Sequence, residues 1–540
     1  MTALAPYQSS VAPPRPPGFR SLLLAEWTKL RTVRGFLIAL LLVVVLPVGF
    51  TLLGRSECSV SNSQNQSFAC PAAPVGPDGE AVDDSFYFVH QALPANGSIT
   101  AEVTGLTGHY ATNNGNRARV GAQPTLASGT QGWSKAGIMI KASTRPGSAY
   151  AAMMVTGSNG TRMQWDYTGD VAGLPGGVSA SSPRWLRLVR SGSVVTGYDS
   201  LNGSTWTQVG RYGVHGLPAT GTVQVGLFAS SPSHVVFGGG IGSQTTGQGP
   251  SVATGTLRHV ALSGASAASS WTATDVTTGN GPPGQQAPGG PFSGSVTSAG
   301  PGAFTVTGAG VIAPDVPSAP DSIGASVQVA LAGMFVGLIV VIILGALFIA
   351  AEYRRGMIRV TLAAAPSRWK VLAAKAVVIF LATFAVGLIA VSATLPIGLH
   401  LLRIGGNPID PISALTQARM IVGTALLLAV SAVLALAIGV MARRSALAIV
   451  AVVAVIFIPY ILVTVTNLLP LSAQEWLLRV LPVAAFSVQQ AYPAYHQVLA
   501  QYEPSSGYYP LPPWGGFAVL VAWAAVALVA AGWLLHRRDA

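Results

Sequence analysis

AEYRRGMIRVTLAAAPSRWKVLAAK, residues Ala351–Lys375, is the one long polar stretch between apolar runs that carries six basic residues. On each side lies a segment without Asp, Glu, Lys or Arg, Val327–Ala350 before it and Ala376–Leu402 after it. Both segments are long enough to cross a bilayer, so the polar stretch must lie at one membrane face. Its basic residues oppose only Glu352, which predicts the cytoplasmic face because short loops rich in Lys and Arg resist translocation.

The same stretch has the pattern of two short helices. Met357, Ile358 and Leu362 are apolar on one side of the first helix. Pro366 interrupts the pattern, and Ser367 is placed to cap the helix that continues into the membrane. We therefore predict that residues 351–375 form a docking element on the cytoplasmic face.

Amino-acid composition divides the chain into two kinds of region. Half of the 540 residues are apolar and 9% are charged, yet 62 Gly and 37 Pro are too many for a purely helical bundle. Residues 55–321 hold 12 basic and 12 acidic side chains, so the net charge of +12 belongs entirely to the remainder. This charge indicates membrane topology, and no pattern of a nucleic-acid-binding protein accompanies it.

Two segments precede the region of zero net charge. Residues 1–18 are polar and Pro-rich, which predicts a disordered cytoplasmic tail. Residues 19–54 combine a helix on the membrane surface with the first span, Phe36–Leu53, which lacks a clean cleavage site and is expected to stay uncleaved. The charged and interfacial residues predicted for the surface helix are Glu26, Trp27, Lys29 and Arg31.

Residues 55–322 are rich in Gly, Ser, Thr, Asn and aromatic residues with period-two alternation, which predicts an all-β sandwich of two sheets. Asn202-Gly203 predicts a two-residue hairpin turn between Val194–Ser200 and Thr205–Val209. These two strands are the second and third of three predicted in succession within Trp185–Gly210. A Gly/Pro-rich linker, GNGPPGQQAPGG, lies near the end of the region. Further strands are predicted at Gly97–Val103, Gly137–Lys141, Tyr150–Val155, Met163–Tyr167, Val223–Ala229, Val235–Gly238, Thr256–Leu262 and Ala303–Ile312.

Apolar spans resume in residues 323–540. They are Val327–Ala350, Ala376–Leu402, Ile421–Met441, Leu447–Leu468 and Gly516–Leu535, which makes six with the first span. Alternation from an inside N-terminus puts every basic cluster and both termini in the cytoplasm, and residues 55–322 outside. The outer loop at residues 469–514 is rich in Tyr, Trp and Pro, which favours the membrane interface. The expected location is therefore the plasma membrane, with multiple spans.

Cys58 and Cys70 are the only cysteines of the chain and follow the first span closely. On an oxidising outer surface the simplest expectation is that they pair and close a small loop, with two free thiols as the alternative.

Motifs that carry enzymatic chemistry are absent from the sequence. There is no GxxxxGK[ST] phosphate loop, no HExxH and no CxxC, and the eight His are scattered. The spans carry no acid or base near mid-depth that could hold a driving ion. We therefore expect no enzyme activity, no cofactor and no metal in this chain, and energy supplied by a cytoplasmic ATPase that binds ATP and acts on residues 351–375.

AEWTKLRTVRG (Ala25–Gly35), EYRRGMIRVTLAAAPSRWKVLAAK (Glu352–Lys375) and the order of six spans resemble the permease subunit of exporter-like ABC transporters. The resemblance covers residues 19–54 and 323–540. It implies a second permease chain, as homodimer or heterodimer, and two ATPase subunits, with residues 351–375 inserted into the ATPase. The residues that it implies for ATPase docking are Glu352, Arg354, Arg355, Gly356, Thr361, Pro366, Arg368 and Lys375. In the alternative, these charges only fix the topology.

The region at 55–322 is similar to concanavalin- or laminin-G-like jelly-roll domains in GWSKAGIMIKAS (Gly132–Ser143) and in its WLRLVRSG strand. Such domains often bind glycans, which would make Trp133, Trp165, Trp185 and Trp206 stacking platforms, although Trp in a sandwich more often packs in the core. Asp166 and Asp170 could bind Ca²⁺, although two carboxylates without more oxygen ligands are usually ordinary turn residues. The alternative function is therefore a membrane-anchored adhesion or sensor protein that binds a cell-wall glycan.

Overall fold

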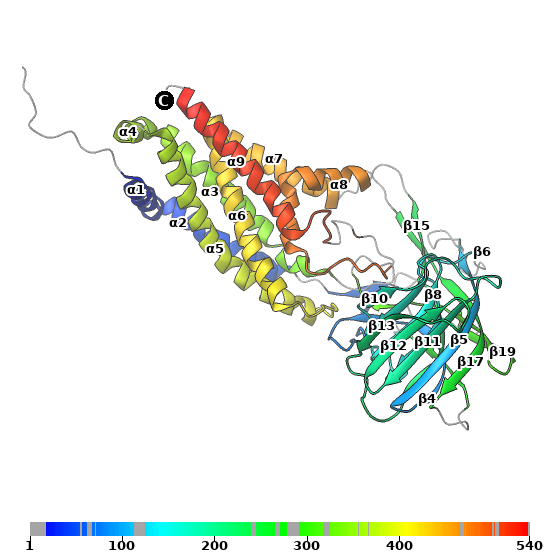
Figure 1. Cartoon of the computed structure of the whole chain (residues 1–540). Coiled ribbons are helices and arrows are strands. Elements are labelled where there is room, and N and C mark those ends of the chain that lie inside the picture. Colours follow the sequence, from blue (N-terminus) through cyan, green and yellow to red (C-terminus); the bar gives the residue numbers. More distant parts are fainter. Residues whose placement is uncertain are drawn as a thin grey trace, which may run out of the picture.

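The computed structural model describes residues 18–54, 57–61, 67–70, 72–112, 125–238, 245–264, 270–277, 291–316, 325–354, 356–365, 367–464, 469, 471–498, 502 and 507–537. Residues 1–17 of the predicted tail (1–18) and the predicted docking residues Arg355 and Pro366 lie outside these ranges. A bundle of helices and a β-sandwich lie end to end (Figure 1).

Six helices of the described chain are long and apolar enough to cross a membrane, which confirms the predicted number. They are α2 (Arg34–Leu53), α3 (Met334–Arg354), α5 (Arg368–Ile404), α6 (Ala414–Ala442), α7 (Ser445–Thr464) and α9 (Pro513–Arg537). Shorter helices adjoin them: α1 (Phe19–Thr32), the 3-10 helix η1 (Val327–Leu331), α4 (Met357–Ala364), α8 (Leu471–Val480) and the 3-10 helix η2 (Pro482–Gln489). Helix α6 packs against α3, α5, α7 and α9 and is the centre of the bundle.

One predicted span boundary is wrong. The span predicted from Val327 is first a 3-10 helix, and α3 begins only at Met334. The break coincides with Gly333, where a Cβ would lie 2.4 Å from the Pro47 carbonyl oxygen of α2. Helix α5 starts at Arg368 and has 37 residues. At about 1.5 Å per residue it is longer than a hydrocarbon core of about 30 Å.

The β region is a sandwich of two antiparallel sheets. The strands of the first sheet are β4 (Phe86–Leu93), β7 (Lys135–Lys141), β8 (Tyr150–Thr156), β9 (Thr161–Trp165), β10 (Gly169–Ala172), β14 (Val223–Ser230) and β18 (Thr272–Val276). Those of the second sheet are β5 (Asn96–Ala111), β6 (Leu126–Ser128), β11 (Arg184–Ser191), β12 (Val194–Ser200), β13 (Thr207–Gly213), β17 (Ser251–Ser263), β19 (Ser295–Gly300) and β20 (Ala303–Gly308). The spatial orders are β10-β9-β8-β7-β14-β4-β18 and β13-β12-β11-β5-β17-β20-β19, with β6 on β5.

Three strand pairs stand apart from these sheets: β1 (Ser59–Ser61) with β2 (Ser67–Ala69), β15 (His234–Gly238) with β16 (Thr245–Gly249), and β3 (Val82–Asp84) with β21 (Ile312–Pro314). The predicted strand Val235–Gly238 is thus in a separate hairpin. Strand β9 ends at Trp165 and not at Tyr167, because Asp166 and Tyr167 have φ of 42° and 59°, which an extended strand does not allow.

Alternating burial defines the core between the two sheets. Along β11, Leu186 and Leu188 are buried in the core, whereas Trp185 and Arg187 lie on the outer face. The predicted two-residue turn at Asn202-Gly203 is wrong, because Asp199 pairs with Thr207 and the loop is longer. The Asn202 Oδ1 accepts hydrogen bonds from the Ser204 and Thr205 amides and so stabilises that longer loop. The two-residue turn occurs one hairpin earlier, between Ser191 and Val194.

The outer face of the first sheet is covered by the chain itself. Strands β3 and β21 enclose a second apolar cluster there, with Phe86, Phe88 and Tyr150 among its members. A buried ion pair lies beside it, with the Lys141 Nζ 2.7 Å from the Asp84 Oδ2. This face is turned toward the helical bundle, because the Gln497 Nε2, in the segment between η2 and α9, donates to the carbonyl of Tyr167 in this cluster at 3.2 Å.

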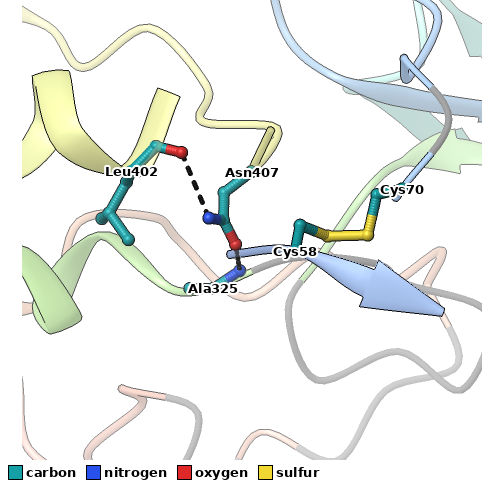
Figure 2. The surroundings of a disulfide bond; sticks show 5 residues. All are labelled: Cys58, Cys70, Ala325, Leu402 and Asn407. Carbon is teal, nitrogen blue, oxygen red and sulfur yellow. Dashed lines mark hydrogen bonds between the residues drawn. A yellow bond between two sulfur atoms is a disulfide. The ribbon is translucent and has the colours of Figure 1, made fainter. Parts of the chain in front are cut away.

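Hydrogen bonds join the sandwich end of the bundle to the segments that enter and leave the sandwich. The structure joins Cys58 to Cys70 by a disulfide, and the Cys58 amide donates to the Gly405 carbonyl at 2.9 Å. Figure 2 shows Asn407 between two partners: its Nδ2 donates to the Leu402 carbonyl at 3.1 Å, and its Oδ1 accepts from the Ala325 amide at 3.0 Å. The loop from α5 to α6 is therefore tied to both chain connections.

Candidate functional site

Helices α1, α3 and α5 bring four charged side chains together at the end of the bundle opposite the sandwich. The Lys375 Nζ lies 2.6 Å from the Glu352 Oε1 and 2.8 Å from the Glu26 Oε2. The Lys29 Nζ lies 2.9 Å from the Glu26 Oε1 and 3.0 Å from the Glu352 Oε1. We call Glu26, Lys29, Glu352 and Lys375 the charged cluster; its two cations balance its two carboxylates.

The charged cluster is mostly withdrawn from solvent. The Lys375 side chain is 1% exposed and stands over the Phe348 ring at 5.2 Å. Glu26 and Glu352 are also buried, and Lys29 reaches the surface. Burial lowers the pKa of Lys29, but the hydrogen bonds that Lys29 donates to the Glu26 and Glu352 carboxylates, together with their negative charges, outweigh this effect and the pKa is raised. Such a cluster fixes the helices that contribute to it, because removing one partner would leave a buried charge uncompensated.

The short helix α4 follows the cluster directly. Gly356 connects α3 to α4 with φ of 66°, a left-handed conformation that favours glycine. Met357 and Val360 are exposed on α4, and Val360 has 72% of its surface accessible. The Thr361 hydroxyl donates to the Met357 carbonyl at 3.1 Å within the helix. Helix α4 thus presents apolar side chains at the far end of the bundle from the sandwich (Figure 1).

The start of α5 is held by α9. The Arg368 Nη1 donates to the carbonyl of Leu535 near the C-terminal end of α9. Trp369 packs against Gly532, where an added Cβ would lie 2.2 Å from the indole ring. Ser367 precedes α5 but forms no side-chain capping bond, so the predicted cap is wrong; the Val371 amide bonds the Ser367 carbonyl instead.

The predicted docking residues therefore fall into different environments. Glu352 and Lys375 are buried in the charged cluster, Arg368 bonds α9, and Gly356 and Thr361 belong to the exposed α4 turn. Arg354 ends α3, but its side chain is not among those described. Sequence reasoning assigned Glu26 and Lys29 to a separate surface helix and missed that they join Glu352 and Lys375. The signal available in the sequence was the presence of opposite charges in or directly beside the apolar helices, because such charges tend to pair when they are buried.

Helix α1 has the predicted amphipathic character. Leu22 and Leu30 are buried against the bundle, while Trp27 and Arg31 are exposed. Glu26 is the departure from the prediction, because its carboxylate points inward to Lys375.

The four Trp residues considered for glycan stacking are half-buried and have partners within the sandwich. Trp165 stacks on Tyr212 at 3.6 Å between ring centroids, and Trp185 stacks on His259 at 5.4 Å. The Arg187 guanidinium lies 4.0 Å from the centre of the Trp206 ring, and Trp133 lies near Lys135 and Arg162.

The two carboxylates considered for Ca²⁺ have different hydrogen-bond partners. Asp170 pairs with Arg162 and accepts from the Gln164 amide nitrogen, and Asp166 accepts from the His215 amide. Burial raises the pKa of Asp166 to about 7, which disfavours the charged form that a cation needs. No group of His, Cys, Asp and Glu in the described part of the chain has the arrangement of a metal site.

Comparisons with solved structures show low similarity. The GH43 BlXynB protein from Bacillus licheniformis is 15% identical, over 32% of this chain and 28% of that chain, with a TM-score of 0.19. A functionally unknown protein from Saccharomyces cerevisiae is 14% identical over 41% and 89%, with a TM-score of 0.18. SCP-B, a peptidase of the Eqolisin family in complex with a tripeptide, is 6% identical over 42% and 98%, with a TM-score of 0.23. TM-scores this low establish no shared fold.

Comparison with protein families gives a match to nearly the whole chain. No curated protein matches the sequence. The family model described as "ABC-2 family transporter protein" matches residues 21–540, which include most of α1, the six apolar helices described above and the sandwich. The chain belongs to the ABC-2 transporter family and is a multi-pass membrane protein with the architecture of a permease subunit.

Proposed function

We propose that this chain is the permease subunit of an ATP-driven exporter and that a separate cytoplasmic ATPase docks on α4. The observation that carries the proposal is the pairing of an exposed apolar α4 with the buried charged cluster directly behind it. An ATPase that moved α4 would pull on Glu352, and the cluster would transmit that force to α1 and α5. The working unit is two permease chains with two ATPase subunits.

The proposed topology follows from the ends of the bundle. Helices α1 and α4 and the C-terminal end of α9 lie together, away from the sandwich (Figure 1). This end carries Arg31, Lys370 and Arg537, so we assign it to the cytoplasm and assign the sandwich to the outside. A disulfide at the sandwich end supports this assignment, because disulfides persist in oxidising surroundings.

Capture of the ATPase by the full-length permease tests the docking surface. The ATPase encoded beside this chain would be co-expressed with the tagged permease and quantified after purification in mild detergent. V360R places a charge on the exposed apolar face of α4, and we expect at least a tenfold loss of captured ATPase, because an apolar contact would have to desolvate that charge. V480R makes the same change at an exposed valine of α8 and serves as the matched control.

If V360R captured as much ATPase as the unmodified chain, α4 would not be the docking site. Loss of capture by V480R as well would indicate general damage rather than a docking defect. Thermal unfolding of both variants, measured on the same preparations, separates these outcomes.

A further inference from the structure

A pocket of about 450 Å³ opens on the side of the bundle where α6 and α9 begin. Both helices start at the end next to the sandwich (Figure 1). The pocket is lined by Leu415, Thr416, Ala418, Arg419 and Val422 of α6 and by Trp514 of α9. In the proposed topology this position is the outer leaflet of the membrane.

Arg419 is the unusual member of this lining, because a charged residue within a membrane-spanning helix is expensive without a partner. One terminal nitrogen, Nη2, donates to the Gln490 carbonyl, which is neutral. The Nε has no hydrogen-bond partner, and no carboxylate of the described chain forms an ion pair with Arg419. The guanidinium therefore lacks a counter-ion and keeps Nη1 available to an anion.

The local backbone adds to this positive charge. Helices α6 and α9 both begin beside the pocket, and neither has an acidic residue in its first turn. Helix N-termini carry partial positive charge that favours anions. Arg419 lies five residues after the first residue of α6, about 8 Å along the axis, which suits the depth of a lipid headgroup rather than the membrane centre.

Apart from Thr416, the remaining lining residues are apolar. Leu415 has 85% of its surface accessible and Trp514 has 51%, and Val422 is exposed about one turn beyond Arg419 along α6. Trp at this level is typical of membrane interfaces, where the indole contacts both headgroups and chains. An occupant that satisfies the pocket must therefore combine an anionic group with a hydrocarbon body.

We propose that this pocket binds an anionic phospholipid, whose phosphodiester accepts hydrogen bonds from Arg419 while an acyl chain lies along Val422. A phosphate oxygen suits the guanidinium because the pair forms charge-assisted hydrogen bonds. Only the assignment to the outer leaflet rests on the proposed function. Binding itself is independent of ATPase docking.

The test measures lipids bound to the full-length protein. The chain would be purified in mild detergent, stripped of lipid, titrated with phosphatidylglycerol or phosphatidylcholine, and examined by native mass spectrometry. We expect one tightly held phosphatidylglycerol per chain, with phosphatidylcholine about tenfold weaker because its choline carries an opposing charge. R419Q should lower affinity for phosphatidylglycerol about tenfold. R479Q changes an exposed arginine of α8 that is already paired with Glu475, and should leave affinity unchanged.

A second variant keeps the proposal testable if R419Q does not fold. A418W fills the pocket without removing the charge, and we expect it to abolish the tight phosphatidylglycerol site while the protein keeps its thermal stability. Equal lipid binding by R419Q, A418W and the unmodified chain would overturn the proposal. Displacement of the lipid by inorganic phosphate would also overturn it, because a site for a free anion makes no use of the apolar wall.

Discussion

Lys375 lies where three helices meet, and its ammonium contacts carboxylates from two of them. Its side chain is 1% exposed, so replacing it by methionine would leave Glu26 and Glu352 buried with only the half-exposed Lys29 as a cation. We expect K375M to lower the free energy of unfolding of the helical bundle by about 3 kcal/mol, measured by chemical denaturation in detergent. K370M, at an exposed lysine one turn earlier in α5, should change little.

A double variant identifies the charge as the cause of that loss. In K375M/E352Q one buried carboxylate is neutralised as well, and Lys29 can balance the other. We expect this pair to recover part of the stability that K375M loses. If the loss of stability in K375M/E352Q equalled the sum of the losses in K375M and in E352Q, the charged cluster would not act as a unit.

Asp410 makes the junction with the sandwich sensitive to pH. Its Oδ1 accepts from the Ala81 amide at 2.5 Å, and Tyr492 donates to its backbone carbonyl at 3.1 Å. Burial, together with the nearby carboxylates of Asp315 and Glu80, raises the pKa of Asp410 to about 7. A raised pKa means that the folded state favours the protonated acid. Its contribution to stability is therefore complete below about pH 4 and lost as pH rises to about 7.

D410N keeps an oxygen for the Ala81 amide and cannot ionise. We expect the unmodified chain to lose stability from pH 5 to pH 8 in thermal unfolding, at about 1.4 kcal/mol per pH unit within the titration window. D410N should reduce that loss but not abolish it, because Asp166 has a similar pKa of about 7. An unchanged pH dependence in D410N would mean that Asp410 is ionised throughout this range.

At the scale of elements, α4 depends on the turn that precedes it. Gly356 has φ of 66° and open space around its Cβ position, so G356A would strain the backbone without a clash. We expect a cost of about 1 kcal/mol for the docked arrangement of α4, and thus about a fivefold loss of ATPase capture. G35A is the matched control, because Gly35 also has open space around its Cβ position but has no positive φ. Equal loss in both variants would exclude the turn as the cause.

The elements that the sequence predicts well are those with a strong period. Six apolar spans and the alternating strands of residues 185–200 follow from burial, which acts on every residue of the element. The boundaries that fail depend on contacts from elsewhere in the chain, such as Pro47 beside Gly333. The turn at residues 200–206 fails because Asn202 bonds two later amides and stabilises a longer loop.

At the scale of the whole molecule, the sequence predicted an inserted sandwich but not its attachment to the bundle. The contacts that fix it join residues hundreds of positions apart, including Ala81 with Asp410 and Gln497 with Tyr167. The charged cluster has the same character, since Glu26 and Lys375 are distant in sequence. Polar residues in such pairs look like ordinary surface positions until the fold brings them together.

The sidedness of α4 and the sandwich is the central claim, and cysteine labelling tests it most directly. Both native cysteines are in the disulfide, so V360C on α4 and L201C on an exposed loop of the sandwich would each present one reactive thiol. A membrane-impermeant maleimide should label L201C on intact cells and label V360C only after permeabilisation. Labelling of V360C on intact cells would place α4 outside, where no cytoplasmic ATPase can reach it, and would contradict the account.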